Sequence, residues 1–108
     1  MVKTAAAFTG CNLELADLSD ASLKGCDLTG SSLREADLTD ADLSGADLKG
    51  CDLFQALTTG AKLDGADLRG AEVSGLDLSA LADHAGMKIT LSQQQALLSA
   101  MGLDVFAD

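Results

Sequence analysis

The residues of this 108-residue chain that could do chemistry are three cysteines, one histidine and many aspartates. Cys11, Cys26 and Cys51 are odd in number and lack a CxxC spacing, which favours reduced thiols over a disulfide framework or a zinc site. His84 has no nucleophile placed beside it by a recognisable motif. Paired carboxylates catalyse hydrolysis only when a cleft gives them different environments. We therefore expect no enzymatic activity, no metal site and no cofactor.

Charge limits the class of partner. Seventeen acidic and seven basic residues give a net charge of −10, which argues against direct binding to nucleic acid or to anionic membranes. A basic protein surface is the natural counterpart, although acidity can also simply keep a narrow rod soluble. No apolar run approaches the roughly 18 residues that span a bilayer. The apolar stretch at the start is too short for a secretion signal, which predicts a cytoplasmic location.

The elements that must position these residues follow a five-residue period over residues 6–80. Twelve of the fifteen third positions are Leu, ten of the first positions are Ala, and the fifth position is most often Gly. This period fits neither an α-helix nor a simple strand. In a locally extended chain the first and third positions share one side, so each repeat offers one small and one large inward group. Glycine at the fifth position permits the bend into the next side.

Units such as ADLTD, ADLSG, ADLKG, CDLTG and ADLRG resemble the pentapeptide-repeat family. The resemblance implies an all-β solenoid, namely a right-handed quadrilateral β-helix of about four coils formed by residues 1–80. Four repeats then make one coil, and residues 20 apart stack on one another. All three cysteines fall at first positions, where a free Cys acts as a small inward hydrophobe.

Indexing the repeats by 20 gathers acidity on one side of the solenoid. That side carries no basic residue and has a net charge of −5 from Asp17, Asp20, Asp37, Asp40 and Asp77. Stacked carboxylates about 4.8 Å apart repel one another within the Debye length of about 8 Å. The side is either a partner-binding face or a solvated face.

One repeat breaks the pattern on this acidic side. In residues 56–60, Leu57 takes the outward second position and Thr58 the inward third position, while Phe54 just before it is also outward. Phe54 and Leu57 form a possible apolar contact for a partner. Alternatively, the chain shifts its register here and buries Leu57.

Residues 81–108 follow a different pattern and are expected to form a cap with a helix near 93–101. Ser92 and Gln95 match a capping box, and Gly102 with Leu103 matches a Schellman end that contacts Leu98. The segment carries more apolar residues than one narrow end requires. We expect it to join two chains into a homodimer through Met87, Ile89, Leu97, Leu98, Met101, Val105 and Phe106.

The stretch from Gly86 to Val105 also resembles the tail of the quinolone-resistance (Qnr-type) branch of the family. That resemblance implies a dimer joined by its C-terminal helix and an acidic rod that imitates DNA and binds DNA gyrase, with protection from quinolones or a toxin. The alternative is a structural scaffold or an engineered model solenoid without a dedicated target.

Overall fold

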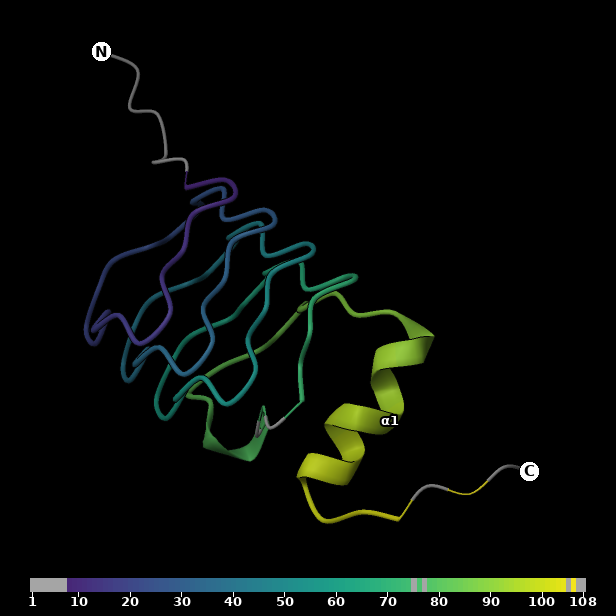
Figure 1. Cartoon of the computed structure of the whole chain (residues 1–108). Helices are drawn as coiled ribbons and strands as arrows, with labels where there is room; N and C mark the ends of the chain where they lie inside the picture. Colours follow the sequence, from purple (N-terminus) through teal and green to yellow (C-terminus); the bar gives the residue numbers. More distant parts are fainter. Residues whose placement is uncertain (1–7, 75, 77, 105, 107–108) are drawn as a thin grey trace.

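The chain winds into stacked coils, and an α-helix lies at the C-terminal end of the stack (Figure 1). The computed structural model describes residues 8–74, 76, 78–104 and 106. Parallel bridges join residues 20 apart, such as Asp17 with Asp37 and Asp27 with Asp47. Because the repeat is five residues long, each coil contains four repeats. The predicted stacking of residues 20 apart is thus confirmed.

Each side of a coil contributes one bridged residue rather than a long strand. The N–H of Leu28 donates to the carbonyl of Asp47 at 2.8 Å, and the N–H of Asp47 donates to the carbonyl of Cys26 at 2.9 Å. At the corner, the N–H of Ala46 donates to the carbonyl of Leu43 at 3.0 Å. These bonds recur along the described repeats, together with a bond from the fifth-position N–H to the next coil, such as Gly45 to Asp64 at 2.7 Å, and they hold the stacked coils in register.

The corners need a left-handed residue at the fifth position of the repeat. Gly45, for example, has φ of +68°, as the third residue of a type II turn requires. Five fifth positions carry a side chain in this conformation instead of Gly: Leu15, Asp20, Glu35, Asp40 and Gln55. An L-residue in the left-handed region costs about 1 kcal/mol or more relative to Gly.

The core is a narrow aliphatic column built from the inward third positions. Leu28, Leu48 and Leu68 stack in one row and are fully buried. Burial of each such side chain contributes about 2 kcal/mol. Small first-position residues such as Ala46 fill the space between the leucines. In the first coil, Phe8 is only partly buried against this column, because no described coil lies beyond it.

Coil pairing continues beyond residue 80 after a shift of one residue. A short 3-10 helix, Leu78–Ala80, precedes bridges from Lys62 to Asp83 and from Asp67 to Lys88. These pairs are 21 residues apart rather than 20. The cap segment therefore starts as a continuation of the solenoid and places Lys88 on the row of Asp27, Asp47 and Asp67.

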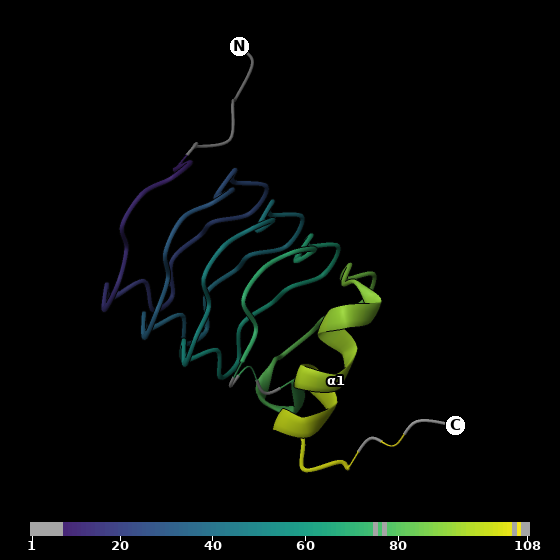
Figure 2. The same cartoon turned by 45° about the vertical axis from the view of Figure 1, so that its right-hand side comes forward.

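Helix α1, Leu91–Ala100, lies across the end of the stack (Figure 2). Its N-cap is Thr90, whose N–H donates to Gln93 Oε1 at 2.7 Å. The predicted capping box at Ser92 and Gln95 is wrong, because the helix starts two residues earlier than that box requires. No helix among the described residues is long and apolar enough to cross a membrane.

The C-terminal end of α1 is the predicted Schellman motif. The N–H of Leu103 donates to the carbonyl of Leu98 at 3.1 Å, and that of Gly102 donates to Ser99 at 3.0 Å. Gly102 has φ of +83°, which this motif requires.

Candidate partner-binding surface

Aspartates at the second position of the repeat hold its corner. Asp17 Oδ1 accepts from the N–H of Ser19 at 3.1 Å and from its hydroxyl at 2.6 Å, and these bonds lower the pKa of Asp17. Asp37 accepts from the N–H of Thr39 at 3.0 Å. The same bond to the residue two positions later is made by Asp27, Asp42, Asp47, Asp52 and Asp67. The recurrence of aspartate at this position is therefore explained by the hydrogen bond that its carboxylate accepts at the corner.

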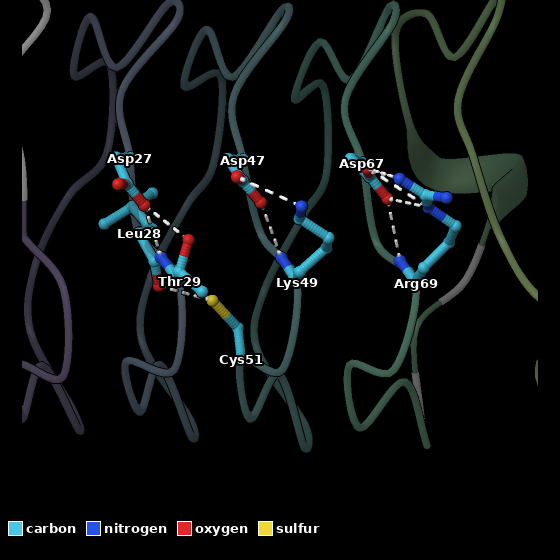
Figure 3. A network of polar contacts seen from close by, with 8 residues as sticks. All are labelled: Asp27, Leu28, Thr29, Asp47, Lys49, Cys51, Asp67 and Arg69. Atoms are coloured by element: carbon cyan, nitrogen blue, oxygen red, sulfur yellow. Dashed lines mark hydrogen bonds and ion pairs between the residues drawn. The ribbon is translucent and has the colours of Figure 1, made fainter.

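On the side shown in Figure 3, most of the negative charge is neutralised within the repeat. Lys49 Nζ lies 3.7 Å from Asp47 Oδ2, and Arg69 Nη2 lies 2.7 Å from Asp67 Oδ2. The Arg69 guanidinium holds the pKa of Asp67 well below its usual range. This side offers little unpaired acidity to a partner, in contrast to the side of Asp17 and Asp37.

Asp20 and Asp40 are acids that the corner geometry does not require. Both are exposed and occupy the fifth position, with φ of +59° and +58°, where Gly would avoid the strain. A Cβ added to Gly60 would lie 2.1 Å from Asp40 Oδ1, so the Asp40 carboxylate leans over the next corner of the row. With Asp17 and Asp37, these residues form the acidic side. The predicted fifth member, Asp77, lies outside the described residues.

Leu57 extends the row of Asp17 and Asp37 with an exposed apolar side chain. Its N–H donates to the carbonyl of Ala36 at 2.9 Å, and its carbonyl accepts from Leu38 at 2.7 Å. The regular pairing keeps Leu57 outward with 56% of its surface exposed, while Thr58 is buried. The alternative in which the chain shifts register to bury Leu57 is therefore wrong.

Phe54 is outward but partly covered by Arg34. The Arg34 guanidinium lies 4.5 Å from the centre of the Phe54 ring, a cation–π distance. Arg34 Nη1 also lies 2.9 Å from Asp52 Oδ2, and its Nε lies 3.9 Å from Glu14 Oε1. The adjoining side thus already holds one guanidinium between an aromatic ring and carboxylates.

Leu15 is an exposed residue that the sequence reasoning missed. It is 74% exposed and has φ of +60°. The signal was present in the sequence, because Leu15 is an apolar residue at a position that the repeat usually fills with Gly. Leu15 marks the corner between the side of Arg34 and the acidic side.

The C-terminal segment divides between the cap and an exposed surface. Leu97, predicted for the dimer interface, is instead buried against the core, Met87 packs partly against it, and Leu98 is half-buried. Val105 lies outside the described residues. The remaining predicted members, Ile89, Met101 and Phe106, are exposed. Leu91 and Leu103, which were not predicted for this surface, are also exposed.

Cysteine chemistry is suppressed by burial. Cys51 Sγ donates to the carbonyl of Leu28 at 2.7 Å (Figure 3), and burial raises the pKa of this thiol to about 11. Cys26 is also buried, whereas Cys11 is half-buried. Within the described ranges, no three His, Cys, Asp or Glu residues gather into a group that could hold a metal ion.

Stacked coils of four repeats with an aliphatic column inside define a repeat solenoid that presents side chains on its outer sides. The chain belongs to the pentapeptide-repeat family, because the model "Pentapeptide repeats (8 copies)" matches residues 4–34, 16–55 and 46–80. A right-handed quadrilateral β-helix is the architecture that this membership implies.

Solved structures of the family resemble the chain. Two trypsin-treated variants of QnrB1, a plasmid-mediated fluoroquinolone resistance protein, are each 28% identical to it, with TM-scores of 0.74 and 0.76. These alignments cover 89% and 91% of this chain but 45% and 47% of QnrB1, so the chain spans less than half of their length. The pentapeptide-repeat protein alr5209 from Nostoc PCC 7120 is 33% identical, with a TM-score of 0.66 over 81% of this chain and 79% of that one. No curated protein matches the sequence.

Proposed function

We propose that this protein is a non-enzymatic interaction protein whose acidic side imitates DNA and binds DNA gyrase or a related type II topoisomerase. The observation that carries the proposal is the pair Asp20 and Asp40. Both are exposed acids at strained corner positions where Gly would be more stable. The description of QnrB1 as a fluoroquinolone resistance protein supports protection from a quinolone as the role of such binding.

The spacing of charge on the acidic side suits DNA mimicry. The first two coils each present two carboxylates there, Asp17 with Asp20 and Asp37 with Asp40. At a coil spacing of about 4.8 Å, this is one charge per about 2.4 Å of axis. Duplex DNA carries one charge per about 1.7 Å counting both strands and per about 3.4 Å along one strand. A surface built to bind DNA phosphates would meet a comparable density of negative charge.

We further propose that two chains associate through the exposed surface at the C-terminal end. Leu91 is 88% exposed and Phe106 is 84% exposed. Leu91 and Leu98 share one side of α1 because they are seven residues apart, and Met101, the C-cap residue after the helix, follows Leu98 by three residues. A two-fold contact through this stripe would join two solenoids end to end and double the length of the acidic side.

Sedimentation velocity tests the dimer. The wild-type chain is expected to sediment as a dimer at micromolar concentration, and Leu91→Glu is expected to yield monomers. Ser92→Glu is the matched control, because it adds the same charge on an exposed part of the same turn. A monomeric wild-type chain, or equal loss of the dimer in both variants, contradicts the proposed interface.

A gyrase supercoiling assay tests the mimicry. The wild-type protein should inhibit supercoiling in a manner weakened by added salt, because counter-ions screen the acidic side. The double variant Asp20→Asn/Asp40→Asn should require about tenfold more protein, consistent with two lost charge contacts. The control Asp27→Asn/Asp47→Asn also removes two charges, but from the side shown in Figure 3, and should inhibit like the wild type.

Two results would contradict mimicry by the acidic side. One is the absence of inhibition at tens of micromolar. The other is an equal loss in both double variants, which would mean that total charge alone matters. Absence of inhibition would favour the alternative, a scaffold without a dedicated target. That alternative is supported by the hydrogen bonds that second-position aspartates such as Asp17 and Asp37 accept from the N–H two residues later, because these bonds give the aspartates a structural role.

A further inference from the structure

Two exposed apolar side chains in the solenoid body stand beside its acidic side. Among the described residues, the large apolar side chains counted as exposed lie between residues 89 and 106, except for Leu15 and Leu57. Leu15 lies at the corner that leads into the acidic side, and Leu57 lies on that side in the row of Asp17 and Asp37. Isolated exposed leucines are common, but these two share one acidic surface.

Neither leucine fills its repeat position in the way that favours the fold. Leu15 holds φ of +60°, a conformation in which Gly is more stable. Leu57 occupies a second position, where Asp37 and Asp52 instead accept a hydrogen bond from the N–H two residues later. Replacing Leu15 with Gly and Leu57 with Asp would restore the usual repeat. The fold is therefore less stable with Leu at these two positions than with the residues that usually occupy them.

The adjoining side shows how a cation binds next to this surface. Arg34 places its guanidinium over the Phe54 ring while it pairs with Asp52 and Glu14. Glu35 and Asp37 lie in the coil between the coil of Leu15 and the coil of Leu57. Carboxylates therefore separate the two leucines along the axis. An arginine of a partner would find the same combination of carboxylates beside apolar groups.

From this arrangement we infer that the edge formed by Leu15, Glu35, Asp37, Phe54 and Leu57 binds a basic amphipathic helix of a partner protein. The two leucines are two coils apart, which is about 9.6 Å along the axis. Side chains seven residues apart on one face of a helix are about 10.5 Å apart. A strand along the axis would cover this distance in about three residues and turn its two side chains to opposite faces. The axial spacing therefore favours a helix over a strand.

In the bound arrangement, two apolar side chains of the helix contact Leu15 and Leu57. Basic side chains midway between them face Glu35 and Asp37. The inference deepens the proposed function and rests on it for the premise that the partner surface is basic. It adds that charge alone does not account for binding, because the two leucines contribute contacts that salt does not screen.

The test uses isotope-labelled protein and a synthetic helical peptide with two leucines seven residues apart and two arginines midway between them. Amide resonances of residues 15, 35, 37 and 57 are expected to shift in a saturable manner. A second peptide has the same composition, but its leucines are five residues apart and therefore lie on different faces. It is expected to bind at least about fivefold more weakly.

Leu57→Asp separates apolar contact from charge. The substitution adds a negative charge, so binding by charge alone predicts tighter association with the basic peptide, whereas the inferred contact predicts about tenfold weaker association. Leu15→Gly is expected to weaken binding by a similar factor. Ser22→Asp adds the same charge at the same repeat position on the neutral side, which we define as the repeats 21–25, 41–45 and 61–65, where the charges of Lys24, Asp42, Lys62 and Asp64 cancel. This control should not weaken binding. Both leucine variants restore the usual repeat, so loss of folding is not expected to obscure the result.

Tighter binding by Leu57→Asp, or equal binding of both peptides, overturns the inference. Shifts confined to the neutral side of Ser22 and Asp42 overturn it as well. The peptide test does not use gyrase. Selective peptide binding without inhibition of supercoiling would therefore remove the gyrase proposal alone, and the reverse outcome would remove this inference alone.

Discussion

The side-chain amide of Gln93 donates to the carbonyl oxygen of Leu68 at 2.5 Å. The same Nε2 donates to the carbonyl of Ala71 at 2.9 Å, and Gln93 is buried. A solenoid ends with carbonyl groups that no further coil can pair. Gln93 supplies a donor for one of them, the carbonyl of Ala71. It gives a second bond to the carbonyl of Leu68, which also accepts from the N–H of Ala71 at 3.0 Å, and its Oε1 accepts from Thr90 and so starts α1. One residue thus links the end of the coils to the start of the cap.

Replacing Gln93 with Ala should strongly destabilise the cap. The carbonyl of Ala71 would lose its buried donor, and an unsatisfied buried group costs about 1–3 kcal/mol, whereas the carbonyl of Leu68 would keep its bond from the N–H of Ala71. We expect chemical denaturation to report a loss of about 1–3 kcal/mol. Gln95→Ala removes an exposed amide of the same helix and should change stability by less than about 0.5 kcal/mol. Equal effects of the two substitutions would contradict the role assigned to Gln93.

The charge and the corner bond of a second-position aspartate are separable. Asn12 accepts from the N–H of Glu14 at 3.1 Å, so a neutral amide can replace the carboxylate in this role. Asp37→Asn should therefore keep its bond to Thr39 and leave stability nearly unchanged. Asp37→Ala should lose about 1 kcal/mol, the usual value of one hydrogen bond. Thermal denaturation checks both, and equal losses would mean that charge rather than the bond matters.

Much of the fold follows from the period alone. The inward rows of Leu28, Leu48 and Leu68, and the burial of Cys26 and Cys51, were predicted because every repeat places the same position inward. This kind of prediction depends on one rule applied many times. The stacking of residues 20 apart was instead implied by the resemblance to the pentapeptide-repeat family, because the period alone does not fix the number of sides in a coil.

Elements that depend on a single contact were harder to predict. The capping box was placed at Ser92 because the sequence there matches the motif, whereas in the structure the amide of Gln93 is held by Leu68 and Ala71. The one-residue shift before Asp83 also leaves no local sequence signal. Exposed Leu15 was not predicted, because a single apolar residue at one corner leaves the five-residue period unchanged.

Removing a side chain from a left-handed corner should stabilise the solenoid. Gln55 is exposed and has φ of +56°. Gln55→Gly is expected to raise the free energy of unfolding by about 1 kcal/mol. The reverse change at an equivalent corner, Gly45→Ala, should lower it by about the same amount, because a Cβ there has open space and only the backbone conformation is strained. Chemical denaturation measures both variants.

Thiol labelling should reveal the difference in burial among the cysteines. Cys11 is half-buried, whereas Cys26 and Cys51 are buried and the pKa of Cys51 is raised to about 11. Only the thiolate reacts with iodoacetamide. At pH 8 without denaturant, we expect mass spectrometry of peptides to find label first on Cys11. Labelling of Cys51 should require unfolding, and equally fast labelling of Cys51 in the folded protein would contradict the buried assignment.

Asp64 should make the fold less stable as the pH rises, whereas an aspartate with a lowered pKa, such as Asp17, makes it more stable as the pH rises. Burial raises the pKa of Asp64, as do the neighbouring carboxyl of Asp83 and the charge of Asp42, and its Oδ1 is buried without a hydrogen-bond partner. Because the folded state binds this proton more tightly than the unfolded state, Asp64 stabilises the fold below its ordinary pKa of about 3.9. That contribution is lost as the pH rises through the raised value.

The variant Asp64→Asn isolates this effect. It should have a higher Tm than the wild type at pH 7, where two adjacent carboxylates are otherwise charged, and the difference should shrink as the pH falls to about 4. Asp17→Asn is the control with the opposite sign. Its lowered pKa means that the native carboxylate stabilises the fold above the ordinary pKa and that this is lost in acid. A Tm difference for Asp64→Asn that is independent of pH would contradict a raised pKa of Asp64 in the folded protein.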